Sequence, residues 1–155
     1  MLAYIDFMNY KMMLFGFLAF ILIGCSDSKP EDRSLVAISE NITIELSKDL
    51  QYNPLQGIDS NVGEITHDND ESFYVFIDIG ELAGSYVDKD KAGVKLGRAI
   101  NQIFVYQKRK SNFLSGGDCC YFFTFPDIGP ANFAAYDNQH IDDVICIVES
   151  LITDS

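Results

Sequence analysis

Residues 73–79 read FYVFIDI, a run of aromatic and β-branched side chains interrupted only by Asp78. Such side chains favour the extended conformation, and a run that is apolar on both faces predicts a strand buried inside a sheet. The polar loop His67–Glu71 separates this run from a second strand-like segment, residues 63–66. Because loops of this kind join antiparallel strands, we expect 63–66 and 73–79 to pair, with 73–79 as a central strand.

Further strand-like runs lie on both sides of this pair. They are residues 35–38, 42–46, 94–100, 103–107 and 119–125, the last ended by Pro126. The first two are joined by the turn residues Glu40 and Asn41 and predict an opening hairpin. For the third and fourth, a single helix over residues 94–106 is the alternative.

The C-terminal segment 138–152 predicts one amphipathic helix. Its apolar residues recur at helical spacing: Ile141, Val144, Ile145, Val148, Leu151 and Ile152. Asp137 or Asn138 is expected to cap its N-terminus. The sequence therefore predicts an α+β protein, an antiparallel sheet of five to seven strands with this helix packed on one face.

The N-terminal segment indicates where the protein is located. Residues 12–25 read MMLFGFLAFILIGC, and the apolar part, 13 residues behind Lys11, fits a secretory signal and is too short for a transmembrane helix. The ending Leu22-Ile23-Gly24-Cys25 resembles a bacterial lipoprotein signal. The resemblance implies removal of residues 1–24, acylation of Cys25 by fatty acids such as palmitate, and attachment to a membrane of the cell envelope; an uncleaved apolar anchor is the alternative.

Two details refine this prediction. Asp6 stands where a signal peptide requires positive charge, so Met8 is the expected start of translation. Ser26, directly after the cysteine, resembles lipoproteins sorted to the outer membrane. Residues 26–34, SDSKPEDRS, contain no aliphatic or aromatic side chain and predict a flexible spacer after the lipidated cysteine, which leaves residues 35–155 as a single domain.

The charge of the chain limits its partners. Of the 23 acidic and 11 basic side chains, 22 and 10 remain after cleavage, so the mature net charge is −12. Nucleic acid is excluded as a partner because phosphate binding requires a basic surface. A net acidic domain also repels anionic lipid, so we expect it to project away from its anchor. The short basic run Lys108–Lys110 is expected to be a solvated turn.

Three cysteines remain besides the lipidated one. Cys119 and Cys120 are adjacent, so on a strand they face opposite sides and at most one can meet Cys146 on the helix. A disulfide between Cys120 and Cys146 is one hypothesis. Three reduced, buried cysteines are the equal alternative.

The segment Gly57-Ile58-Asp59-Ser60, with Gly63 and the later strand end Asp78-Ile79-Gly80, resembles a group of small bacterial envelope lipoproteins that share a GIDS-type turn and a D-x-G strand end. The order of hairpin, sheet and closing helix is more loosely similar to PsbP-like and DcrB-like periplasmic domains. These resemblances imply a fold and a location, and neither carries a catalytic residue onto this chain.

The same residues permit two interpretations. Gly57 and Gly63 bracket a turn in which Asp59 and Ser60 hydrogen-bond local amides. Alternatively, Ser60 is a nucleophile with His67 or His140 as base and Asp59 or Asp78 as orienting acid, although the sequence has no G-x-S-x-G elbow.

Metal binding has little support in the sequence. The loop His67–Glu71 lacks the glycine and distal glutamate of an EF-hand and predicts a solvated turn. Two histidines without a C-x-x-C motif argue against a transition-metal site.

Aromatic side chains gather near the C-terminus. We expect these side chains to pack in the core. The alternative is that alternate members of residues 121–125 face out of the sheet and form a contact patch rimmed by residues 129–133, a predicted loop. We therefore expect a membrane-anchored, non-enzymatic accessory domain without a cofactor, which binds an envelope protein, a peptide or a small apolar ligand. An envelope serine hydrolase using Ser60 and a structural subunit of an envelope complex are the alternatives.

Overall fold

The computed structural model describes residues 32–57, 60–80, 83–110 and 120–154. Within these ranges the chain forms ten strands and one helix. In chain order they are β1 (Arg33–Ser39), β2 (Ile42–Ser47), β3 (Leu50–Leu55), β4 (Asn61–His67), β5 (Asp70–Ile79), β6 (Lys95–Arg98), β7 (Ile103–Arg109), β8 (Cys120–Phe125), β9 (Ala131–Tyr136), α2 (Ile141–Glu149) and β10 (Ile152–Thr153).

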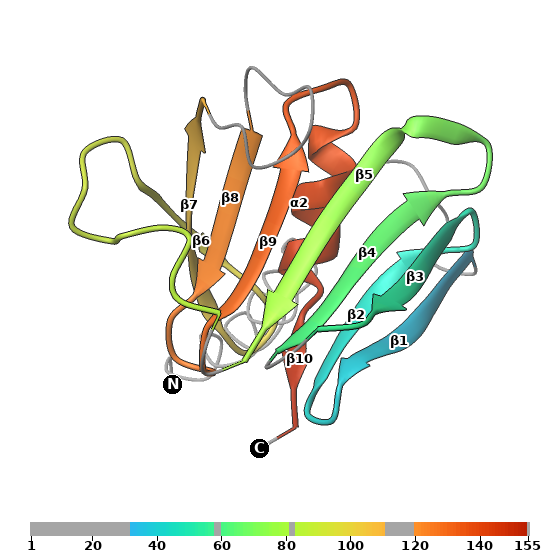
Figure 1. Cartoon of the computed structure of the whole chain (residues 1–155), viewed down its shortest axis with the longest axis horizontal. Coiled ribbons are helices and arrows are strands. Elements are labelled where there is room, and N and C mark those ends of the chain that lie inside the picture. Colours follow the sequence, from blue (N-terminus) through green and yellow to red (C-terminus); the bar gives the residue numbers. More distant parts are fainter. Residues whose placement is uncertain (1–31, 58–59, 81–82, 111–119, 155) are drawn as a thin grey trace, which may run out of the picture.

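The strands make two antiparallel sheets (Figure 1). The large sheet has seven strands in the order β3-β4-β5-β9-β8-β7-β6, and the small sheet has three in the order β1-β2-β10. Together with the C-terminal helix, this confirms the predicted α+β class. The long strand β5 lies inside the large sheet, paired with β4 on one side and β9 on the other, as its apolar sequence predicts.

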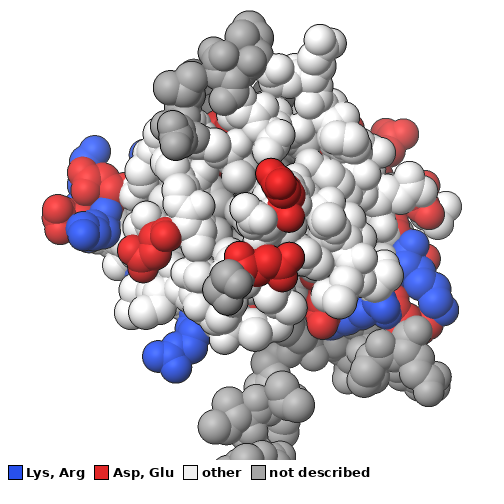
Figure 2. All heavy atoms as spheres, turned by 90° about the horizontal axis from the view of Figure 1, so that it is seen from below, with Lys and Arg blue, Asp and Glu red and all other residues white. Residues whose placement is uncertain are grey.

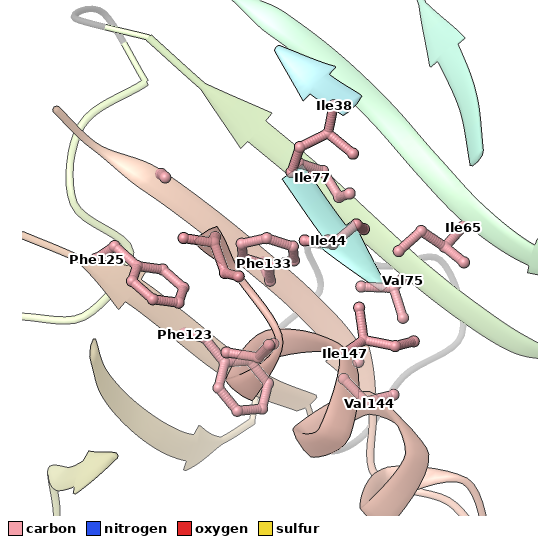
Figure 3. Close-up of a cluster of buried hydrophobic side chains, with 14 of the residues drawn as sticks. Ile38, Ile44, Ile65, Val75, Ile77, Phe123, Phe125, Phe133, Val144 and Ile147 are labelled. Carbon is pink, nitrogen blue, oxygen red and sulfur yellow. The ribbon is translucent and has the colours of Figure 1, made fainter. Parts of the chain in front are cut away.

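The small sheet and α2 cover the same face of the large sheet. Side chains at alternate positions of β4, β5, β8 and β9 share one buried cluster with side chains of β2 and α2 (Figure 3). The residues at its centre are wholly buried, among them Ile44, Ile65, Val75, Ile77 and Phe133. Alternation is expected, because successive side chains of a strand point to opposite faces. The main core therefore lies between the large sheet and a layer made of β1, β2 and α2.

The opposite face of the large sheet has a smaller core. Cys120, Phe122, Val105 and Ala134 form it together with Val87, which belongs to the irregular segment 83–94. We call this segment the strap. The backbone N–H of Val87 donates a hydrogen bond to Oγ1 of Thr124 at 3.1 Å, which ties the strap to β8. The strap therefore covers part of this face of the large sheet, as α2 covers part of the other face.

Several predicted elements are confirmed with adjusted bounds. The opening hairpin is formed by β1 and β2, but it belongs to the separate small sheet. Strands β6 and β7 replace the alternative of a helix over residues 94–106. The helix is shorter than predicted, because it ends at Glu149 and Ile152 enters β10 beside β2. β1 begins at Arg33, so the predicted spacer of residues 26–34 extends two residues too far into the domain.

Two strands were missed for local reasons. β3 contains Pro54 and polar residues, which is tolerated because β3 is an edge strand of the large sheet. β9 carries three alanines and follows Gly129-Pro130, and its start was predicted to be a loop. It nevertheless occupies the middle of the large sheet, between β5 and β8, where all its residues except Tyr136 are buried.

Core packing of the aromatic residues in 121–125, the default expectation, is confirmed for the three phenylalanines. Phe122, Phe123 and Phe125 are all at most 1% exposed. Phe122, which faces away from the helix, lies under the ring of Tyr86 from the strap, at 6.0 Å between centroids. These phenylalanines therefore do not form the exposed patch that was the alternative.

Candidate functional site

A cavity of about 230 Å³ lies where the small sheet, the large sheet and α2 meet. We call it the junction cavity. Every layer contributes to its lining, which consists of Arg33 from β1, Glu45 and Ser47 from β2, Leu50 from β3, His67 from β4, Phe73 from β5, and His140, Asp143, Cys146 and Ile147 at and along α2. Residues more than 100 positions apart in the chain are thereby brought together.

The floor of the junction cavity is apolar. Phe73, Cys146 and Ile147 are 3%, 7% and 4% exposed, so only a small part of each side chain is accessible from the cavity. The Phe73 ring lies between the two histidines of the chain, with its centroid 5.5 Å from that of His140 and 6.4 Å from that of His67. This floor offers a surface for an apolar or aromatic group.

The rim of the junction cavity carries charges of both signs. Arg33 Nη1 lies 3.8 Å from Glu45 Oε2, and both side chains remain partly exposed. On the opposite side, His140 Nε2 lies 2.8 Å from Asp70 Oδ2, and its Nδ1 lies 3.8 Å from Asp143 Oδ2. Arg33 and the carboxylates of Glu45 and Asp143 therefore border an apolar floor.

Local turns hold His140 in place. Its backbone N–H donates to Oδ1 of Asn138 at 3.0 Å, so Asn138 organises the turn that enters α2. His140 itself is the N-cap residue and makes no side-chain capping bond, which corrects the expectation that Asp137 or Asn138 is the cap. Asn138 Nδ2 also donates to the carbonyl of Ser72 at 2.8 Å, which joins this turn to the β4–β5 hairpin.

On the β4–β5 hairpin, hydrogen bonds also hold Asp70, the partner of His140, in place. Asp70 Oδ1 accepts hydrogen bonds from the hydroxyl and the backbone N–H of Ser72, at 2.6 and 2.9 Å. These bonds stabilise the carboxylate and, with a smaller contribution from His140, hold the pKa of Asp70 below its ordinary value. Asp70 is therefore an anion that orients the imidazole of His140.

The end of α2 is bonded to the small sheet. Ser150 Oγ accepts the backbone N–H of Glu45 at 2.9 Å and donates to the carbonyl of Ile147 at 2.7 Å. One hydroxyl therefore links the last turn of the helix to β2. Together with the pairing of β10 and β2, this bond fixes the position of α2 relative to the Glu45 side of the junction cavity.

Gly57 and Ser60 lie elsewhere, in a shallow groove between β1 and β3. A Cβ atom on Gly57 would lie 2.2 Å from the carbonyl oxygen of Ser60, so the chain closes tightly here and only glycine fits. Asp59 lies outside the described residues. A local turn remains the interpretation that these contacts support.

The structure does not assemble the proposed serine triad from the described residues. Ser60 precedes β4 and His67 ends it, which separates them by roughly 20 Å at the rise of an extended strand. His140 lies at the His67 end, because Asp70, its partner, is opposite His67 in the β4–β5 register. The side chain of Asp78 is turned toward the strap and bonds Tyr86.

Asp78 belongs to a polar network beneath the strap. Its Oδ2 accepts the hydroxyl of Tyr86 at 2.9 Å, whereas Oδ1 is buried and accepts no hydrogen bond from the described residues. Asn132 Oδ1 accepts from the hydroxyl of Thr124 at 2.7 Å and from the backbone N–H of Tyr86 at 3.1 Å. Burial raises the pKa of Tyr86, and the Asp78 carboxylate raises it further. The network fastens the strap to β5, β8 and β9.

The other two glycines of the predicted motif are structural. Gly63 is not in a turn but inside β4, where a Cβ atom would lie 2.3 Å from the ring of Tyr52. Gly80 ends β5 with φ of 149°, and its N–H donates to the carbonyl of Pro130 at 3.2 Å. In the β4–β5 register Val62 lies opposite Asp78 and Asn61 opposite Ile79, so the motif residues gather at one end of these strands, where each makes its own structural contact.

The disulfide predicted between Cys120 and Cys146 is wrong. Both residues are buried and no disulfide joins them. Cys120 belongs to the core under the strap, whereas Cys146 faces the junction cavity on the other side of the large sheet. Cys25, the expected lipidation site, and Cys119 lie outside the described residues.

Metal binding is not supported where the structure can be examined. In residues 32–57, 60–80, 83–110 and 120–154, no three His, Cys, Asp or Glu side chains are placed to hold a metal ion. The loop between β4 and β5 is a tight turn whose Asp70 is bonded to Ser72 and His140. Over the same ranges no helix has the length and hydropathy to cross a membrane.

Comparison with known proteins does not assign the chain to a family. No protein-family model matches it, and searches of curated proteins and of solved structures find no match either. The candidate site therefore has to be argued from its own geometry.

Sequence reasoning missed the junction cavity because its lining has no local motif. One signal was present: the chain has only two histidines, and both His67 and His140 line this cavity. They were considered as bases for Ser60, and their common neighbour Phe73 was assigned only to a strand.

Proposed function

We propose that this protein is a lipid-anchored lipoprotein of the bacterial cell envelope whose domain binds a small amphiphilic molecule without chemically changing it. The junction cavity is the observation that carries this proposal. Its buried floor of Phe73, Cys146 and Ile147 suits an apolar group, and its charged rim suits an ionic head group. Such a combination of apolar walls and a few fixed polar groups is typical of ligand sites.

The rim narrows the class of ligand. Arg33 can bind a carboxylate, whereas Glu45 and Asp143 can bind an ammonium group. A cavity of about 230 Å³ is smaller than the sites that hold drug-sized molecules. The proposed ligand is therefore a small zwitterion with an apolar side chain, whereas the sequence alone predicts an envelope protein, a peptide or a small apolar ligand.

Among the described residues, the separation of Ser60 from both histidines supports binding over hydrolysis by Ser60. Ser60 borders the groove between β1 and β3, and the described histidines border the junction cavity. The proposal of lipid anchoring rests on the signal-like ending Leu22-Ile23-Gly24-Cys25.

Ligand binding is tested with three matched probes: phenylalanine, phenylacetate and phenethylamine, each titrated and followed by ligand-observed NMR. We expect the zwitterion to bind most tightly and Arg33→Ala to weaken phenylalanine and phenylacetate while leaving phenethylamine unchanged. Lys48→Ala, which removes an exposed cation of the β2–β3 turn, is the control. Equal binding of all three probes to both variants would contradict the assignment of the site.

Anchoring is tested by the intact mass of the protein from a membrane fraction. We expect a mass that begins at acylated Cys25. A mass that retains residues 8–24 without lipid would contradict the anchor and leave the ligand experiment unaffected.

A further inference from the structure

Within the net charge of −12, basic and acidic side chains are distributed unevenly along the chain. Residues 88–110 contain seven of the 11 Lys and Arg side chains of the chain and only two of its 23 acidic side chains. This segment therefore has a net charge of +5 within an acidic protein. It forms the end of the strap, β6 and β7.

These elements occupy one end of the molecule. β6 is the edge strand of the large sheet, β7 is its neighbour, and the strap projects beyond both (Figure 1). Seen from below, Lys and Arg side chains stand toward both sides of the surface with acidic side chains among them, and further acidic side chains lie over the centre (Figure 2). The composition of residues 88–110 therefore places most of the basic side chains at one sheet edge and not over a whole face.

The same edge exposes aliphatic side chains. Leu96, Ile100 and Ile103 are 72%, 61% and 41% exposed, and they are three of the five large hydrophobic side chains exposed among the described residues. Leu96 pairs with Val105 and Arg98 with Ile103 in the β6–β7 register. Because directly opposed residues share a face, Leu96, Arg98 and Ile103 lie together on the face away from α2.

Aromatic rings hold cations on both faces of this edge. Lys95 Nζ lies 5.9 Å from the centre of the Tyr106 ring, and the Arg109 guanidinium lies 4.4 Å from the centre of the Phe122 ring. Long basic side chains packed in this way cover apolar surface with their methylene groups and direct their charge outward. We call the surface formed by Leu96, Arg98, Ile100 and Ile103, with Lys95 beside it, Lys89 and Lys91 on the strap and Arg109 at the far end of β7, the basic edge.

We propose that the basic edge docks the domain on a membrane surface that contains anionic lipid. Exposed aliphatic side chains next to basic ones match the boundary between lipid head groups and acyl chains. There the aliphatic side chains enter the interface and the basic side chains bind lipid phosphate. A membrane is preferred over a second copy of this chain as the occupant, because the proposed anchor makes lipid the surface nearest to the basic edge. Docking rests on the proposed membrane anchoring, which brings the domain to the lipid surface. The proposal replaces the expectation from the sequence that the whole domain is repelled by anionic lipid.

The chain contains no tryptophan, so a single introduced tryptophan reports its own surroundings. The full acylated chain carrying Ile100→Trp is reconstituted in nanodiscs of phosphatidylcholine, with and without phosphatidylglycerol. Leu55→Trp is the matched control, because Leu55 is 42% exposed on β3, the opposite edge strand of the same sheet. Emission wavelength and quenching by brominated lipid are measured, and circular dichroism confirms that each variant is folded.

We expect blue-shifted, lipid-quenched emission from Ile100→Trp only in anionic nanodiscs, reversed by added salt, with no change for Leu55→Trp. Adding Arg98→Glu to Ile100→Trp should abolish the shift. Unshifted emission, equal shifts at both positions, or a shift that depends on protein concentration rather than on phosphatidylglycerol would overturn the proposal. The intact mass of the same sample reports separately whether the chain is acylated. If it is not, co-sedimentation of the unacylated chain with anionic vesicles tests binding by the basic edge.

Discussion

His140 Nε2 lies 2.8 Å from Oδ2 of Asp70, a residue 70 positions earlier in the chain. The contact joins the start of α2 to the β4–β5 hairpin and closes one side of the junction cavity. Asp70 is in turn fixed by Ser72, so the imidazole meets an oriented carboxylate. Stability and the shape of the candidate site therefore depend on the same pair.

Replacing this carboxylate should change how stability depends on pH. The pKa of Asp70 is lowered in the folded state, chiefly by Ser72, so its stabilising contribution is present above about pH 4 and is lost as pH falls through the lowered value. We expect Asp70→Asn to melt at a lower temperature than the unmodified chain at neutral pH, with the difference shrinking toward pH 2. Glu71→Gln, at an exposed neighbouring position, is the control. A difference that stays constant over this range would contradict the linkage.

The stabilisation that the bond between Tyr86 and Asp78 provides should be lost at alkaline pH. Burial and Asp78 raise the pKa of Tyr86, so this contribution to stability is complete below about pH 10 and is lost as pH rises toward the raised value. Tyr86→Phe removes the hydroxyl and should cost about 1–2 kcal/mol in denaturant unfolding at pH 7, because a hydrogen bond to a half-buried carboxylate is lost. Above pH 10 the difference between the two proteins should decrease. Tyr136→Phe serves as the control, and an equal cost there would argue against a specific role for the Asp78 bond.

Gly63 should tolerate a side chain only when Tyr52 is shortened. The Cβ atom of Gly63→Ala would lie 2.3 Å from the Tyr52 ring, which also donates a hydrogen bond from its hydroxyl to the carbonyl of Ile38 at 3.2 Å. Displacing the ring should cost about 1–3 kcal/mol. In a double-mutant cycle with Tyr52→Ala, the cost of Gly63→Ala should largely disappear. Strict additivity would show that the two side chains do not interfere.

The two buried cysteines should react with thiol reagents only after unfolding. Cys120 and Cys146 are 0% and 7% exposed, and they lie on opposite sides of the large sheet. In protein that is kept reduced, we expect iodoacetamide to modify both residues rapidly in denaturant and slowly in the native state, because both are buried. Peptide mapping of the products is the measurement, and equally fast modification in the native and denatured protein would refute this arrangement.

The junction cavity shows why some features escaped sequence analysis. Residues 73–79 predict their own strand, because the signal is a run of apolar residues that are consecutive in the sequence. Phe73 gives no local sign that it lies between His67 and His140, since that contact requires the β4–β5 hairpin to meet the turn before α2. Similarly, Pro54 weakens the strand signal of β3, and only its edge position makes the strand possible.

The sequence by itself determined the antiparallel pairing of 63–66 with 73–79, the opening hairpin, the C-terminal helix and the α+β class, because these depend on the periodicity and turn chemistry of neighbouring residues. Tertiary structure alone decided that the hairpin forms a second sheet with β10, that the strap covers Phe122, and that Cys120 and Cys146 lie apart. It also decided which polar side chains meet at the junction cavity and at the basic edge. Those outcomes depend on which faces of distant elements pack together, and no local periodicity encodes that choice.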